Sequence, residues 1–249
     1  MSYNSAANFT MQTRSDKPTL LGNRLYVEAM KLANRGDHIR GYRLLREAAA
    51  RRYAPAQFAV ACFMEFGVGT KRDTHGAFRW YKLAAANGEI SAIYTIGVCY
   101  EEGIGVAKNL KNANRWYRRA AALGDGDAMF ASALCLRYGR GVRRNLSSAF
   151  CLLKRAERRG CRAARFSIGV CYSQGEGTRV DKKKALLWFR KAAITGDADA
   201  QFNVGYFLEH GIGTGCDIPS ARRWYAKAAK AGDMSAKQAL ETLVPAAQI

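Results

Sequence analysis

No stretch of the sequence approaches the roughly 18 to 20 consecutive apolar residues that a membrane-spanning helix needs. The first twenty residues, MSYNSAANFTMQTRSDKPTL, also lack the apolar core of a secretory signal. They are rich in Ser, Thr and Asn, and Arg14 and Lys17 stand against Asp16 alone. We therefore expect no transmembrane span and a disordered tail over residues 1–21, with a mitochondrial presequence as the alternative.

The residue patterns of the common catalytic and metal sites are also missing. There is no nucleophile elbow, no phosphate-binding loop and no isolated pair of carboxylates. His38, His75 and His210 have no Cys or carboxylate at the spacing of metal ligands. We therefore expect no catalytic site, no cofactor and no bound metal.

What the sequence does contain is a repeat of 36 residues. Paired glycines recur at this step without a single insertion: Gly67/Gly69, Gly103/Gly105, Gly139/Gly141, Gly175/Gly177 and Gly211/Gly213. Other columns keep the same step, including Trp80, Trp116, Leu152, Trp188 and Trp224. A period of 20 to 50 residues indicates stacked structural repeats rather than one closed core.

Each repeat is predicted to be a helical hairpin. Apolar or small residues at helical spacing from Ala92 predict a first helix, which ends at the Gly-x-Gly loop. An Asp or Asn column then supplies N-cap oxygens for a second helix: Asp73, Asn109, Asn145, Asp181 and Asp217. In one repeat, the apolar face of that second helix consists of Ala113, Trp116, Tyr117, Ala120 and Ala121. A single hairpin buries too little apolar surface to fold alone, so each must pack on the next.

These residues resemble the Sel-one-like repeats (SLR), relatives of the tetratricopeptide repeat. The family pattern is clearest in the fifth repeat, at Ala200, Phe202, Val204, Gly205, Leu208, Gly211, Gly213, Asp217, Ala221, Trp224, Tyr225, Lys227, Ala228, Ala229, Gly232 and Asp233. The resemblance implies an all-α fold, a right-handed α/α superhelix of 36-residue helix-turn-helix repeats. It also implies a scaffolding role in multiprotein complexes and assigns no catalytic residue.

The period and the resemblance together predict the domain organisation. The segments after the tail are a degenerate N-terminal capping repeat at 22–54, five repeats at 55–90, 91–126, 127–162, 163–198 and 199–234, and a C-terminal capping helix and tail at 235–249.

Three of the seven cysteines, Cys99, Cys135 and Cys171, fall in one column inside the first helix of the repeat, where other repeats have Phe63 and Phe207. We expect them to be buried and free, because equivalent helices lie too far apart for a disulfide. Free thiols predict a reducing intracellular compartment, with the cytoplasm favoured over the mitochondrion.

Some positions of the first helix vary between repeats and are candidates for ligand contacts. If this helix lines a concave face, as in related solenoids, a partner would meet Thr95, Glu102, Tyr138, Gln174, Asn203 and His210. The alternative is that these positions merely tolerate change.

The sequence is strongly basic, with 40 Lys and Arg against 20 Asp and Glu and a net charge of +20. Between residues 137 and 191 the excess is densest. The predicted surface for an anionic partner consists of Arg137, Arg140, Arg143, Arg144, Arg158, Arg159, Arg162 and Arg165.

We therefore predict a non-catalytic adaptor that binds other proteins with acidic surfaces through the basic third and fourth repeats. The alternative function is an RNA-binding structural component of a ribonucleoprotein particle, with the same arginines contacting phosphates. An anionic membrane surface explains the charge equally well.

Overall fold

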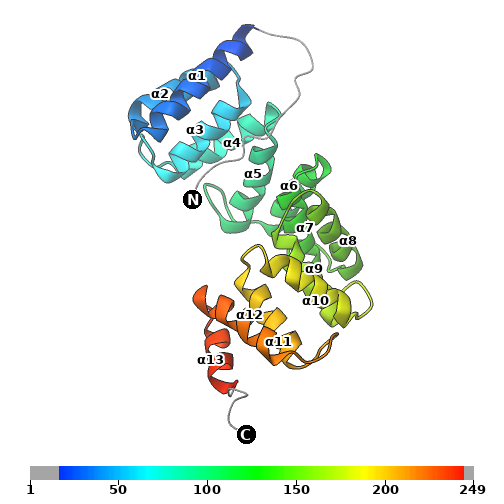
Figure 1. Ribbon diagram of the computed structural model, residues 1–249. Coiled ribbons are helices and arrows are strands. Elements are labelled where there is room, and N and C mark those ends of the chain that lie inside the picture. Colours follow the sequence, from blue (N-terminus) through cyan, green and yellow to red (C-terminus); the bar gives the residue numbers. More distant parts are fainter. Residues whose placement is uncertain (1–16, 244–249) are drawn as a thin grey trace. The chain divides into compact units, whose positions relative to one another are not determined.

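The computed structural model of the protein describes residues 17–243. Within this range the chain is entirely helical, with thirteen α-helices and no strand (Figure 1). The helices are α1 (Lys17–Asn34), α2 (His38–Ala50), α3 (Ala54–Phe66), α4 (Thr74–Ala86), α5 (Ile90–Glu102), α6 (Leu110–Ala122), α7 (Gly126–Tyr138), α8 (Leu146–Arg158), α9 (Ala163–Gln174), α10 (Lys182–Ala193), α11 (Ala198–Glu209), α12 (Ile218–Lys230) and α13 (Met234–Thr242). The all-α prediction is confirmed.

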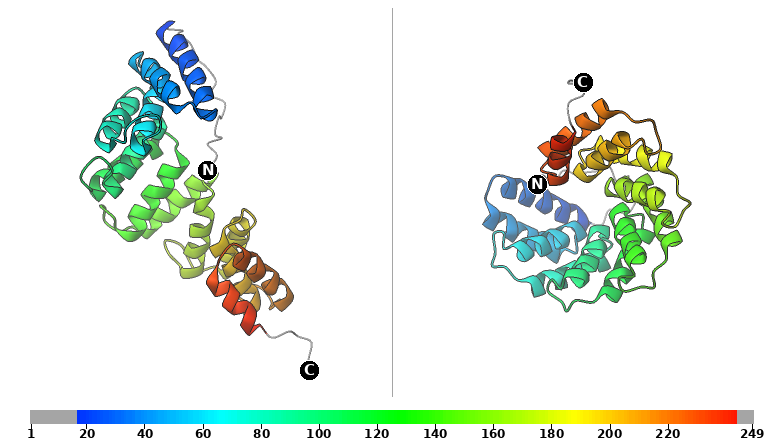
Figure 2. Two further views of the ribbon diagram at one scale, coloured as in Figure 1. Left: turned by 90° about the vertical axis from the view of Figure 1, so that its left-hand side faces the viewer. Right: turned by 90° about the horizontal axis from the view of Figure 1, so that it is seen from below.

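The chain divides into two compact units, Met1–Ala92 and Ile93–Ile249, with the boundary inside α5. Every predicted repeat is a hairpin of two helices, which we call the A helix and the B helix. The A helices are α3, α5, α7, α9 and α11, and the B helices are α4, α6, α8, α10 and α12. Within the second unit each of α7 to α12 packs on its neighbours in the sequence (Figures 1 and 2).

The prediction of a tail over residues 1–21 is wrong for residues 17–21, because α1 begins at Lys17. Leu20 and Leu21 belong to this helix although about half of each side chain is exposed. Residues 1–16 and 244–249, which include the rest of both predicted tails, lie outside the described residues. The segment predicted as an N-terminal cap holds the hairpin of α1 and α2, and the C-terminal segment holds α13.

The predicted N-caps of the B helices are confirmed. In all five repeats the Asp or Asn side chain accepts a hydrogen bond from the backbone N–H three residues later, as Asn145 does from Ser148 at 2.9 Å. This bond satisfies one of the N–H groups that a helix N-terminus leaves without a partner in the helix. Each B helix therefore begins at a fixed residue, which fixes the register of the repeat.

The two glycines of the loop have different roles. Gly139 ends α7 with a φ of 70°, a left-handed conformation that residues with a side chain rarely adopt. Gly141 also has a positive φ, and a Cβ atom there would collide with the backbone carbonyl of Leu110 in the preceding repeat. The first glycine thus terminates a helix, while the second allows two repeats to approach closely.

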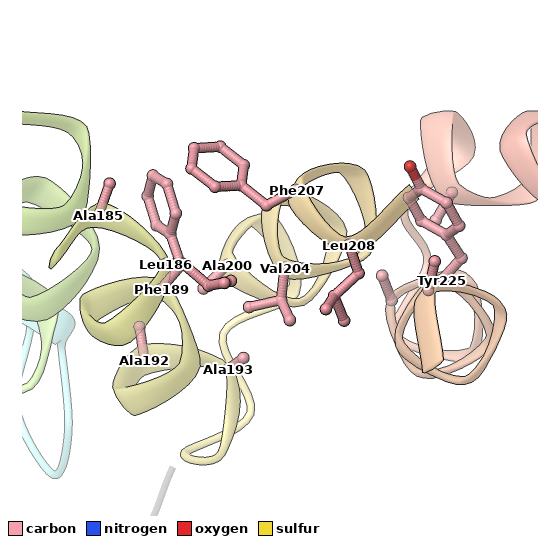
Figure 3. Close-up of a cluster of buried hydrophobic side chains, with 13 residues drawn as sticks. Ala185, Leu186, Phe189, Ala192, Ala193, Ala200, Val204, Phe207, Leu208 and Tyr225 are labelled. Atoms are coloured by element: carbon pink, nitrogen blue, oxygen red, sulfur yellow. The ribbon is translucent and has the colours of Figure 1, made fainter. Parts of the chain in front are cut away.

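The core lies between A and B helices of the same and adjacent repeats. Figure 3 shows one cluster, in which Phe189 of α10 meets Val204 and Phe207 of α11. The Phe189 and Phe207 rings are 5.4 Å apart and nearly perpendicular. In the B helices the fully buried aromatic is the residue after the Trp column: Tyr117 is 1% exposed, whereas Trp116 is half-buried. Trp80 and Trp224 are also half-buried, whereas Trp188 is 6% exposed and belongs to the core.

Candidate functional site

A hollow of about 240 Å³ opens on the surface formed by α5, α6 and α7. Its lining is mostly apolar and comes from the A helices of the second and third repeats, from Tyr117 of α6 and from Arg140. The lining residues are Tyr94, Val98, Glu101, Tyr117, Phe130, Ala131, Leu134, Cys135 and Arg140. Ala131 is the smallest of the lining side chains. A hollow of this size matches a single side chain better than a cofactor.

Charged groups stand at the rim of this hollow. The Glu101 carboxylate accepts a hydrogen bond from the Tyr117 hydroxyl at 2.5 Å and forms an ion pair with Arg140 at 3.4 Å. Burial and the bond to Glu101 raise the pKa of Tyr117, so this hydroxyl remains a donor. Arg140 belongs to the loop after α7, and half of its side chain is exposed. It therefore has surface left for an anionic group of a ligand.

An exposed tyrosine lies beside the same rim. The Tyr138 ring is 56% exposed, and the guanidinium carbons of Arg137 and Arg140 lie 5.2 Å and 5.3 Å from its centroid. Such cation–π contacts favour this ring position. The Arg137 guanidinium in turn contacts Glu176 of the next repeat, with Nε 2.6 Å from Oε2. One continuous set of contacts thus links Glu101, Arg140, Tyr138, Arg137 and Glu176 across three repeats.

The burial of Arg137 corrects the predicted anionic-partner surface. The residue as a whole is only 8% exposed, and its charge is already neutralised by Glu176. Arg165 is likewise half-buried and paired with Glu157 at 3.5 Å. Both arginines belong to contacts within the fold, so neither offers a free charge to a partner.

The remaining six arginines do not form one cluster. Arg140, Arg143 and Arg144 lie in the loop before α8, whereas Arg158, Arg159 and Arg162 lie at or beyond its C-terminal end. All six are exposed, and Arg144 also donates to the Arg137 carbonyl. A helix of thirteen residues is about 20 Å long, so the two groups are that far apart along the hairpin. We call the first group the loop arginines.

Five of the six predicted A-helix residues lie on α5, α7, α9 and α11, His210 follows α11, and none of the six lines the hollow. Glu102, Tyr138, Gln174 and His210 are exposed at or just beyond the C-terminal ends of their helices. Thr95 and Asn203 are half-buried, and the Asn203 amide donates to the Asp199 carbonyl. The prediction missed the walls of the hollow, Tyr94, Phe130 and Leu134, because their columns are apolar throughout and indicate core.

Cys135, which lines the hollow, does not have a reactive thiol. Burial raises the pKa of its thiol to about 11, so at neutral pH it is protonated and a poor nucleophile. Cys99, Cys135 and Cys171 are at most 3% exposed, as predicted for core positions.

Over the described residues, no three or more His, Cys, Asp or Glu side chains gather as a metal site would require. None of the helices in 17–243 is both long enough and apolar enough to cross a bilayer.

Comparison with known families identifies the repeat. The family model of the Sel1 repeat matches residues 54–89, 90–125, 126–161, 162–197 and 198–233. The chain belongs to the Sel1 repeat family. Each matched segment begins one residue before the boundary predicted from the period. Sel1 repeats are protein–protein interaction scaffolds and are typically non-catalytic.

Two solved Sel1 repeat structures are similar to the chain. A Sel1 repeat protein from Oxalobacter formigenes is 27% identical, with a TM-score of 0.80 over 87% of this chain and 86% of that one. A protective antigen of uropathogenic Escherichia coli with an SLR fold is also 27% identical, with a TM-score of 0.80. It aligns with 90% of this chain, which covers 47% of the antigen. Comparison with curated proteins gives no match.

Proposed function

We propose that this Sel1 repeat protein is a non-catalytic adaptor that binds an acidic segment of another protein on its third repeat. The observation that supports this is that Arg140, one of the loop arginines, lines the apolar hollow. An apolar side chain of the partner enters the hollow, and flanking carboxylates meet Arg140 and Arg143. Charge pairs at the edge of such a site raise the association rate and the specificity, while the buried anchor contributes most of the affinity.

The geometry favours a short extended segment over a folded domain. The hollow accommodates about one side chain, and the loop arginines follow it along the chain within a few residues. Tyr138 adds an exposed aromatic surface between them. The proposed binding site therefore involves the A helices of the second and third repeats and the loop that follows α7.

Affinity capture with three variants tests the proposal. Ala131→Leu fills the hollow without a charge change, and Arg140→Gln with Arg143→Gln removes two loop charges. The control, Arg158→Gln with Arg159→Gln, makes the same charge change at the opposite end of α8. The lysate is treated with nuclease, so that proteins bridged by nucleic acid are not recovered.

We expect the same set of proteins to be lost with the first two variants and retained with the control. Binding of a synthetic acidic peptide from a captured protein should weaken at least tenfold in the first two variants. Equal capture by all three variants would contradict the site, and a loss with the control alone would place it at the other end of α8.

A further inference from the structure

The positive charge of the second unit is segregated by helix. Its B helices α6, α8, α10 and α12 carry sixteen Lys and Arg and one acidic residue, Glu157. The A helices α5, α7, α9 and α11 carry two bases and five acids. Both bases of the A helices, Arg137 and Arg165, are held in ion pairs. The excess charge is therefore a property of one set of helices, repeated through the unit.

Most of these sixteen Lys and Arg side chains are accessible to a ligand. Fifteen are exposed and only Lys154 is half-buried. Among the described residues Lys184 is the one member with an ion-pair partner, Asp181. The single acid, Glu157, is itself occupied by Arg165. We call the outward side of these four helices the B face.

Contacts between adjacent repeats join the bases of neighbouring helices. Trp188 of α10 lies between Lys154 of α8 and Lys191 of its own helix, with both Nζ atoms 4.2 Å from the ring centroid. Burial, helped by the charges of Lys191 and Arg158, lowers the pKa of Lys154, while Glu157 opposes this shift. The cationic groups of α8 and α10 thus come close enough to repel each other. A bound polyanion would relieve that repulsion.

We propose that the B face binds the phosphodiester backbone of nucleic acid, independently of base sequence. This goes beyond the adaptor role and uses a different surface. Lys and Arg side chains recur on four consecutive hairpins and all carry positive charge. Such a row matches a linear polyanion, whose negative charges recur along its length.

The aromatic residues of the face explain why the binding is not sequence-specific. Trp116, Trp188 and Trp224 are partly or fully buried, and each ring carries a cation at 4.2 to 5.2 Å. Rings covered in this way do not offer a free surface on which a base can stack. They hold the Lys and Arg ends in position for phosphate contacts instead.

Two other classes of anionic partner fit the face less well. A lipid surface is bound by apolar side chains that enter the interface together with the bases. Leu187 is the one large apolar side chain exposed on the four described helices, and Leu123 and Ile194 follow the ends of α6 and α10. A protein partner would meet these side chains with one acidic patch of limited area, whereas the Lys and Arg of the B face recur on four consecutive hairpins.

The test is the binding of fluorescently labelled oligonucleotides to the full chain. The probes are a 30-nucleotide single-stranded RNA of mixed sequence, the DNA of the same sequence, and the corresponding duplexes, so that the source of the phosphate can be distinguished. The variant carries Arg115→Glu, Arg155→Glu, Arg190→Glu and Arg223→Glu, one on each B helix. The matched control carries Lys108→Glu, Arg162→Glu, Arg179→Glu and Lys237→Glu, which are also exposed and lie outside the B helices and the hollow.

We expect micromolar or tighter binding by the unchanged chain in low salt, with similar affinity for unrelated base sequences. The logarithm of the binding constant should fall linearly with the logarithm of the salt concentration, by roughly 0.7 per phosphate contact on a single strand. The B-face variant should bind at least 30-fold more weakly and show a shallower salt dependence. The control should change less than threefold. Circular dichroism and thermal unfolding verify that both variants remain folded, and the salt dependence of the unchanged chain tests the proposal without any variant.

Three results would overturn the proposal. Equal weakening by the two variants would mean that net charge, and not the B face, attracts the oligonucleotide. Binding to vesicles containing phosphatidylserine without binding to any oligonucleotide would assign the face to a membrane. Absence of oligonucleotide binding at 50 mM salt would mean that the B face does not bind nucleic acid. None of these results bears on the proposed binding of an acidic segment at the hollow, because that test uses a nuclease-treated lysate and substitutions at different residues.

Discussion

The Nε atom of Arg137 lies 2.6 Å from Oε2 of Glu176, which belongs to the loop of the following repeat. One repeat earlier, the equivalent positions are held by Glu101 and Arg140, at 3.4 Å and with the charges exchanged. The same contact between consecutive repeats is thus made twice with opposite polarity. The buried pair has side chains 10% and 22% exposed, and the other has 50% and 22%.

Removing one partner of the buried pair should destabilise the protein strongly. Glu176→Gln leaves the Arg137 charge buried without a counter-ion, which typically costs about 3 to 5 kcal/mol. Arg140→Gln, at the exposed pair, should cost less than about 1 kcal/mol. Urea unfolding of both variants checks the difference, and equal losses would mean that burial does not decide the strength of these pairs.

Exchanging the charges of the buried pair should restore most of the stability. Arg137→Glu alone places two carboxylates together and should cost at least as much as Glu176→Gln. Adding Glu176→Arg reproduces the polarity of the Glu101–Arg140 contact in the preceding repeat. We expect the double variant to recover at least half of the loss in urea unfolding. A double variant no more stable than Arg137→Glu would show that the local surroundings accept one polarity only.

The burial of Arg137 also marks where sequence reasoning stopped. The 36-residue columns predicted the hairpins, the N-caps such as Asn145 and the buried cysteines, because these depend on local spacing. The column of Arg137 holds glutamate in three repeats, so the sequence predicts that this arginine adds charge to the surface. Its partner Glu176 is 39 residues away in a column that is otherwise apolar or basic. Only the packing of consecutive repeats brings the two together.

The separation of the exposed arginines into two groups could be predicted from the sequence. Arg143 and Arg158 flank a helix of thirteen residues, so their separation follows from helix length alone. A net charge summed over residues 137–191 does not show that the arginines form two groups. It also does not show that Lys and Arg are concentrated on the B helices. Counting by helix separates the two sets. The hollow could not be predicted, because it depends on how Ala131 and Tyr94 lie across two repeats.

A hydrogen bond recurs where a B-helix tyrosine meets an A-helix glutamate. The Tyr225 hydroxyl donates to Glu209 at 2.6 Å, as Tyr117 does to Glu101. Tyr225→Phe removes a bond to a charged acceptor and should cost about 1.5 to 3 kcal/mol in urea unfolding. The fourth repeat has Phe189 instead, with Ser173 in the glutamate column. The reverse change, Phe189→Tyr, buries a hydroxyl without this acceptor and should also destabilise, so a gain in stability would contradict the pairing.

Thiol labelling should distinguish the exposed cysteines from the buried ones. Cys151 and Cys216 are exposed, Cys62 is half-buried, and the buried cysteines are Cys99, Cys135, Cys161 and Cys171. Ellman's reagent should modify the exposed pair within minutes in the native protein and the buried four only after unfolding. A Cys151→Ser, Cys216→Ser variant removes the rapid phase. Rapid native reaction of Cys135 or Cys171 in that variant would show that the core opens on the time scale of the reagent.

The buried thiols also predict a loss of stability at alkaline pH. Burial raises the pKa of Cys171 from 9.0 to about 11, with Arg137 lowering it and Glu176 raising it to a smaller extent. Because the folded-state pKa is the higher one, the stabilising contribution is complete below about pH 9. It is lost between pH 9 and about 11, where the unfolded chain releases the proton more readily.

The measurement is the free energy of unfolding in urea, under reducing conditions, at intervals from pH 7 to 11. Cys171→Ala should flatten the decline above pH 9 by on the order of 2 kcal/mol, because a shift of one pKa unit corresponds to about 1.4 kcal/mol. Cys151→Ala removes an exposed thiol and serves as the matched control, with a profile parallel to that of the unchanged chain. Tyr81, Tyr117 and Tyr225 also have raised pKa values, so part of the decline should persist in the Cys171 variant above pH 10. If the two cysteine variants decline in parallel, the Cys171 thiol ionises as easily in the folded protein as in the unfolded chain, and the core at the third and fourth repeats is more open to water than its packing indicates.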